Sequence, residues 1–71
     1  MTINDAVSQK IKKAREAAGV SQAKVARRCG WSQSYYWNVE NGRVRISVEM
    51  ACQVARALEV KVVEWLPEDC R

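Results

Sequence analysis

One short pattern that occurs twice constrains the fold of this chain more than any other feature. Glycine, one apolar residue, serine and glutamine follow each other at 19–22 and again at 30–33. Glycine ends helices because it adopts the left-handed backbone conformation without steric cost. Serine begins the next helix by accepting a hydrogen bond from a backbone N–H. Each copy therefore predicts the end of one helix and the start of another, which leaves a short helix between them.

The apolar spacing elsewhere predicts further short helices and no strand. We expect an all-α, compact five-helix bundle, formed by 1–71 as a single domain, with helices at about 3–18, 22–29, 33–41, 48–59 and 62–66. Thr2 and Asp5 have the spacing of a capping box, and Ser47 is placed to cap the fourth helix. The residues expected in the core share a helical repeat: Val7, Ile11, Ala14, Ala18, Val25, Ala26, Cys29, Ala51, Val54, Ala55 and Leu58.

Composition excludes several classes of protein. The 71 residues include no histidine, so the commonest general base and metal ligand is missing, and we expect neither an enzyme nor a cofactor. Cys29, Cys52 and Cys70 are odd in number and widely spaced, which argues against a disulfide framework and against a zinc site. No apolar run approaches the length of a membrane span, and no signal peptide or small-molecule site is evident. We therefore expect a cytoplasmic protein.

The helices at 22–29 and 33–41 are separated by a three-residue turn with a glycine, which predicts a helix-turn-helix. On a helical wheel, one side of the second helix is polar but uncharged; it consists of Gln33, Ser34, Trp37, Asn38 and Asn41. The opposite side carries Tyr35, Tyr36, Val39 and Glu40 and is expected to face the core. Amide side chains can pair with adenine in the major groove of DNA. The alternative is an exposed helix that happens to be rich in such residues.

Charge is distributed unevenly along the chain. Nine Lys and Arg residues oppose two Glu residues in 10–45, whereas three basic residues oppose five acidic ones in 46–71. The basic excess thus surrounds the predicted helix-turn-helix, where DNA phosphates would lie. The alternative is an ordinary solvated basic face.

From residue 11 to residue 66 the chain resembles the lambda-repressor-like helix-turn-helix family, also called the Xre or Cro/repressor type. The similar segments are IKKAR at 11–15, GVSQAKVA at 19–26, GWSQS at 30–34, VENG at 39–42, LEV at 58–60 and WL at 65–66. The resemblance implies a DNA-binding transcriptional regulator, of about the size of a Cro-like repressor, that acts as a symmetric homodimer on double-stranded DNA. A palindromic operator follows from that symmetry.

The resemblance also implies roles for individual residues. Gln33, Ser34 and Asn38 match positions that read bases, and Arg15 and Glu40 match a structural ion pair. Phosphate contacts are expected from Gln22, Lys24, Arg27, Asn41, Arg43 and Arg45. The dimer interface is expected among Val44, Ile46, Val62, Val63, Trp65 and Leu66, although some of these must close the core. Lys61 replaces the usual cap of the last helix, which weakens the prediction of that helix.

Two points stay open at the level of the sequence. Trp37 either packs on a thymine methyl or a sugar, or it fills the core after a rotation of its helix. The same fold could also serve as an antitoxin or as a bridging protein-interaction module, with the basic half binding an acidic partner instead of DNA.

Overall fold

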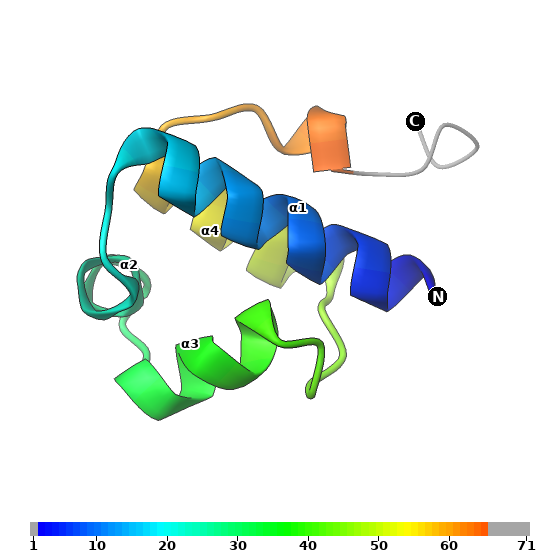
Figure 1. Cartoon of the computed structure of the whole chain (residues 1–71), viewed down its shortest axis with the longest axis horizontal. Helices are drawn as coiled ribbons and strands as arrows, with labels where there is room; N and C mark the ends of the chain where they lie inside the picture. Colours follow the sequence, from blue (N-terminus) through cyan, green and yellow to red (C-terminus); the bar gives the residue numbers. More distant parts are fainter. Residues whose placement is uncertain (1, 66–71) are drawn as a thin grey trace.

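The computed structural model describes residues 2–65 and contains four α-helices followed by a 3₁₀-helix (Figure 1). Their bounds are α1 Ile3–Ala18, α2 Gln22–Cys29, α3 Gln33–Glu40, α4 Val48–Leu58 and η1 Val62–Trp65. Within residues 2–65 there is no strand, and no helix is long and apolar enough to cross a membrane. In Figure 1, α1 crosses the middle of the molecule with α4 behind it, while α3 and η1 lie on opposite sides of this pair.

The helix starts depend on the predicted caps. Thr2 and Asp5 form a complete capping box, in which the Asp5 N–H donates to the Thr2 hydroxyl at 3.1 Å. Ser21, Ser32 and Ser47 each accept a hydrogen bond from the backbone N–H three residues later. These capping predictions are confirmed, and they explain why three short helices begin within a chain this small.

Two glycines end the first two helices as predicted. Gly19 has φ +68° and Gly30 has φ +75°, both in the left-handed region. Glu59 ends α4 in the same conformation, with φ +59°, although it is not a glycine. Arg28 reaches across to this end and donates from Nη1 to the Ala57 carbonyl at 2.7 Å, which satisfies one of the terminal carbonyl groups.

The core lies where α1, α4 and η1 meet α2 and α3. Its buried apolar side chains are Val7, Ile11, Val25, Ala26, Tyr36, Val39, Ala51, Val54, Ala55, Ala57, Leu58 and Trp65. Most of the expected core residues are among them, while Ala14 and Cys29 are half-buried at its edge. The prediction for Ala18 was wrong. This residue is exposed in the last turn of α1, next to Gly19.

The predicted fifth helix is a single 3₁₀ turn at Val62–Trp65, so residues 2–65 form four α-helices and this turn, and the expectation of five helices is met only in part. Four residues are too few for a stable α-helix, and Lys61 offers no side-chain oxygen as a cap. Two other helices end one residue early. Asn41 caps α3 and Glu59 caps α4, so both residues lie just outside the helices in which they were expected. Leu66 and Cys70 lie outside the described residues.

The turn after α3 is held tightly against α1. Gly42 has φ +70°, and a Cβ atom at this position would come within 2.9 Å of Asp5 Oδ1. Further along, Asn4 donates from Nδ2 to the Val44 carbonyl at 3.0 Å and accepts from the Ile46 N–H at 2.7 Å. The loop that carries Arg43 and Arg45 is therefore anchored to α1 at two points.

Candidate nucleic-acid interface

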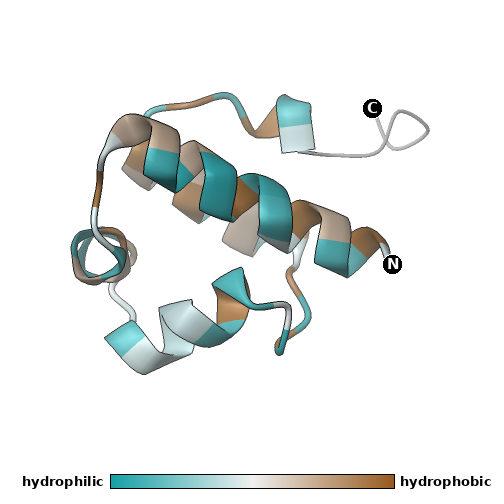
Figure 2. Cartoon of the chain, in the orientation of Figure 1, coloured by the Kyte–Doolittle hydropathy of each residue, from teal (hydrophilic) through white to brown (hydrophobic). Residues whose placement is uncertain are grey.

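The two sides of α3 differ in burial. Tyr36, Val39 and Glu40 are buried against the rest of the molecule, whereas Gln33 and Ser34 are exposed and Asn38 is half-buried. Figure 2 shows α3 as teal at its start, pale in its middle, and teal and brown toward its end. The exposed side of α3 is formed by uncharged polar groups and an indole ring, which is unusual for a solvent-facing helix surface.

The placement of Tyr35 differs from the expectation. This side chain was expected in the core, but it is 38% exposed. Its ring packs edge-on against Trp31, with ring centroids 5.2 Å apart. Trp31 also stacks with the buried ring of Tyr36, with centroids 6.5 Å apart, so Tyr35 lies at the exposed edge of an aromatic cluster.

A buried polar network joins α1, α2 and α3. Arg15 donates to the Glu40 carboxylate through two nitrogens, Nε at 2.7 Å and Nη2 at 3.1 Å. Its Nη1 donates to the Val20 carbonyl at 2.9 Å. Gln22 donates from Nε2 to Glu40 Oε1 at 3.1 Å. The network fixes the end of α3 relative to α1, to the start of α2 and to the turn between α1 and α2. Charge-assisted bidentate contacts of this kind are strong and directional.

The carboxyl group of Glu40 is charged at neutral pH. Burial alone would raise its pKa, but the interactions with Arg15, Tyr36 and Gln22 together outweigh burial and lower the pKa below its ordinary value. Conversely, the hydrogen bond to Glu40 raises the pKa of Arg15. The Tyr36 hydroxyl lies in the same region and has no hydrogen-bond partner, since its approach to Glu40 does not reach hydrogen-bonding geometry. Burial raises the pKa of Tyr36 well above its ordinary value.

Trp37 lies on the exposed side of α3, which resolves the two placements left open by the sequence. Its side chain is 42% exposed and does not belong to the core. The Arg43 guanidinium lies over its ring, 5.3 Å from the centroid. Trp37 also lines a shallow depression together with Gln22, Gln33 and Ser34. This depression joins the start of α2 to the exposed side of α3.

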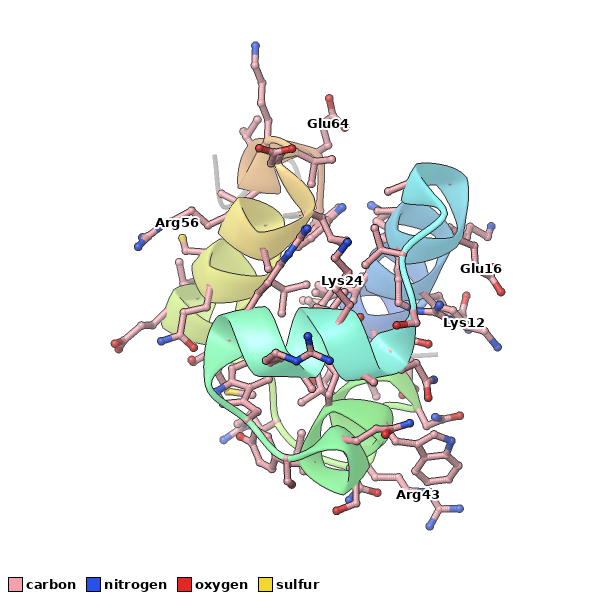
Figure 3. The ribbon with its side chains drawn as sticks, turned by 90° about the vertical axis from the view of Figure 1, so that its left-hand side faces the viewer. Lys12, Glu16, Lys24, Arg43, Arg56 and Glu64 are labelled. Carbon is pink, nitrogen blue, oxygen red and sulfur yellow. The ribbon has the colours of Figure 1, made fainter. Side chains whose placement is uncertain are left out.

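The structure brings some of the expected phosphate contacts to this surface and separates others. Arg43 extends from the turn beneath α3, whereas Lys24 rises from α2 on the side away from α3 (Figure 3). Arg27 and Arg45 are exposed, and Asn41 donates from its side-chain amide to the Trp37 carbonyl at 2.8 Å. Figure 3 places Glu64, an acidic residue of η1, at the far end of the molecule from Arg43 and from α3.

The residues expected at a dimer interface fall into two groups. Trp65 is only 4% exposed, and Val44, Ile46 and Val62 pack against the core, so their apolar area is largely used within the chain. Val63 is 44% exposed. Leu66 was also expected at this interface and lies outside the described residues.

The cysteines offer little reactive chemistry in the described part of the chain. Cys29 and Cys52 are free thiols and half-buried, and burial raises the pKa of Cys29, which disfavours the reactive thiolate. Among residues 2–65 no group of three His, Cys, Asp or Glu side chains is placed to hold a metal ion.

Sequence reasoning missed two contacts that position the interface. The amide of Asn4 anchors the loop after α3, and Gln22 binds Glu40 within the chain. Both contacts join residues that are 18 or more positions apart, so no local pattern in the sequence signals them.

Comparison with known proteins places this geometry in a family. Residues 6–65 match the family model described as "Helix-turn-helix domain". A search of curated proteins found no match. Three solved structures are similar: the clp gene regulator ClgR from C. glutamicum, the restriction-modification controller protein C.AhdI from Aeromonas hydrophila, and the hypothetical transcription factor NHTF from Neisseria.

The similarity to ClgR has a TM-score of 0.88 at 25% identity and covers 92% of this chain and 84% of that chain. For C.AhdI the TM-score is 0.79 at 28% identity, and the match covers 90% of this chain and 96% of that chain. For NHTF the TM-score is 0.82 at 28% identity, and the match covers 99% of this chain and 82% of that chain. Together with the capped α2–turn–α3 unit, these matches show that the chain belongs to the helix-turn-helix domain family, in its lambda-repressor-like (Xre) branch.

Proposed function

We propose that this protein is a sequence-specific transcriptional regulator that inserts α3 into the major groove of double-stranded DNA. The observation that carries this proposal is the exposed side of α3, where neutral amide and hydroxyl groups lie beside Trp37 and the Arg43 guanidinium that covers its ring. The other side of the same helix is held by the Arg15–Glu40 ion pair. Membership of the helix-turn-helix family supports the same conclusion.

Base recognition is assigned to Gln33, Ser34 and Asn38. Gln33 is the first residue of α3 and is exposed, and the first turn of a recognition helix is the part that reaches the base edges. A glutamine or asparagine amide can make two hydrogen bonds to adenine, to N6 and N7. Ser34 can donate to or accept from either base of a pair.

Contacts to the DNA backbone are assigned mainly to Gln22, Arg27, Arg43 and Arg45. Gln22 is the first residue of α2, where free backbone N–H groups favour a phosphate. Its amide nitrogen carries two hydrogens, so the one not donated to Glu40 can bind a phosphate oxygen. Lys24 and Asn41 contribute less in this proposal, because Lys24 lies on the side away from α3 and the Asn41 amide already binds Trp37.

The regulator acts as a homodimer on a palindromic operator, in the manner of a small Cro-like repressor. A single helix of eight residues contacts few base pairs, so useful specificity requires two copies on half-sites about 34 Å apart. Two of the proteins with similar structures are a gene regulator, ClgR, and a restriction-modification controller, C.AhdI. Val63 of η1 is the exposed apolar residue that we propose for the contact between the two protomers.

Selection from a random duplex pool tests the proposal. The protein is incubated with the pool at low and at moderate salt, and bound duplexes are sequenced over several rounds. We expect enrichment of one palindromic sequence, with affinity that falls as salt rises. Binding without any sequence preference would contradict base recognition. Binding to an acidic protein partner in the absence of duplex binding would instead support a protein-interaction module.

A further inference from the structure

We infer that Trp37 and Arg43 form one recognition unit that binds the C5-methyl group of a pyrimidine in the major groove, which in ordinary DNA is the methyl group of thymine. This inference rests on the proposed function, since it requires α3 to lie in the groove. It adds a hydrophobic contact to the hydrogen bonds assigned to the amides and names the chemical group that the contact recognises.

The position of Trp37 is the first argument. Its indole shares the exposed side of α3 with Gln33 and Ser34, and the three side chains line the same depression with Gln22. Any duplex that meets Gln33 and Ser34 must therefore also meet the indole. A large apolar ring in this place is not explained by packing, because Trp37 does not belong to the core.

The chemistry of the groove identifies the target. The base edges in the major groove present hydrogen-bond donors, acceptors and one apolar group, which is the C5-methyl of thymine. The one polar atom of an indole is the Nε1–H at its ring edge, so of these groups the methyl is the one that the apolar ring face packs against most favourably. Packing on a deoxyribose would be equally favourable for every sequence, and it would therefore contribute no base preference.

Arg43 completes the unit by holding the ring. Its guanidinium covers the indole at 5.3 Å from the centroid, an arrangement that is attractive through the ring quadrupole. The backbone of this turn is fixed by the left-handed Gly42, which lies against Asp5, and by the bond from Asn4 to Val44. The ring is thus held from the loop side, and the planar guanidinium keeps N–H groups at its edge for a phosphate.

The size of the effect follows from the burial of one methyl group. Removing a buried methyl costs about a fourfold loss of affinity. Cytosine lacks this group and 5-methylcytosine carries it at the same position of the groove. The unit therefore predicts that methylation of a cytosine placed there raises affinity by about the same factor.

The experiment uses the full chain and the duplex obtained by selection. Each thymine of one half-site is replaced in turn by deoxyuridine, which removes only the methyl group, and affinities are measured for the wild type, Trp37→Ala, Arg43→Lys and Gln33→Ala. We expect one thymine in the substituted half-site whose methyl raises the affinity of the wild type about fourfold. Trp37→Ala should bind the two duplexes equally, and Arg43→Lys should show a reduced difference because a lysine cannot stack as a plane.

Gln33→Ala is the matched control on the same helix. It weakens binding through a hydrogen bond but leaves the indole in place, so it should retain the full methyl effect. Duplexes with cytosine and with 5-methylcytosine at the same position should differ in affinity by the same factor, and this difference should disappear in Trp37→Ala.

Each outcome discriminates. Duplex binding in which every deoxyuridine is neutral, or a methyl effect that persists in Trp37→Ala, would overturn the inference and leave the proposed function intact. Failure of the wild type to bind any duplex would overturn the proposed function and this inference with it.

Discussion

The two sides of α3, a helix of eight residues, differ in burial and in how their polar groups are hydrogen-bonded. On the inner side, Glu40 is buried and bound by Arg15 and Gln22, so its hydrogen-bonding capacity is used within the chain. On the outer side, Gln33 and Ser34 are exposed to solvent. The difference separates two tasks. The inner side sets the position of the helix, and the outer side offers polar groups to a ligand.

Among the substitutions on the two sides of α3, we expect the largest effect from Arg15→Ala, which leaves the Glu40 carboxylate buried without its partner. We expect the free energy of unfolding to fall by about 3 kcal/mol, because an unpaired buried charge is costly. For a chain of this size that is a large share of the total stability. Urea titration followed by circular dichroism measures the loss.

Lys13→Ala is the control for Arg15→Ala, because Lys13 is an exposed cation on the same helix. It should change stability by less than about 0.5 kcal/mol. Equal losses in the two variants would show that charge in α1, and not the pair with Glu40, stabilises the fold.

Acidification tests the inner side through the lowered pKa of Glu40. A carboxyl whose folded pKa lies below its unfolded value of about 4.3 stabilises the fold above that pH, and the contribution is lost as the pH falls through the folded pKa. Each unit of depression corresponds to about 1.4 kcal/mol. Urea titrations between pH 7 and pH 3 should show this loss in the wild type, and a weaker dependence in Glu40→Gln. An unchanged profile in the variant would assign the acid sensitivity to other carboxyls.

Arg45→Ala tests the surroundings of the outer side. If Arg45 contacts a phosphate, its loss should weaken binding to all duplexes alike and reduce the slope of log affinity against log salt by about 0.9 per contact. Lys61→Ala removes an exposed cation that precedes η1, on the side of the molecule opposite α3, and should leave the slope unchanged. A change of base preference in Arg45→Ala would mean that this residue reads bases.

The smallest effect is expected from Tyr36→Phe, which removes a buried hydroxyl without a hydrogen-bond partner. The free energy of unfolding should stay within about 1 kcal/mol of the wild type, because no hydrogen bond is lost and desolvation is relieved. Thermal and urea unfolding of the two proteins provide the comparison. A larger loss of stability would show that the hydroxyl donates to Glu40 in solution.

The fold could be predicted largely because its signals are local. Ser21, Ser32 and Ser47 cap helices through bonds that span three residues, and Gly19 and Gly30 end helices through their own backbone conformation. The last turn could not be predicted in this way. Lys61 gives one local warning, because it has no side-chain oxygen to cap a helix, but the residues at 62–65 do not by themselves specify an α-helix or a 3₁₀ turn.

The candidate site was predictable in composition but not in detail. The polar stripe of α3 followed from helical spacing alone, but the same spacing placed Tyr35 in the core. Tyr35 instead packs edge-on against Trp31, which stacks with Tyr36, and the wheel of a single helix does not indicate such contacts. The contact of Trp37 with Arg43 could not be predicted either, because it depends on the conformation of a turn that Gly42 holds against α1.

The central claim is that the outer side of α3 reads bases while the inner side only holds the helix. Its most direct test is the base preference of Gln33→Ala at every operator position, measured together with the free energy of unfolding. The account predicts that discrimination falls by about 1–3 kcal/mol at one position of each half-site, with stability unchanged within about 0.5 kcal/mol. An unaltered preference at every position would contradict it.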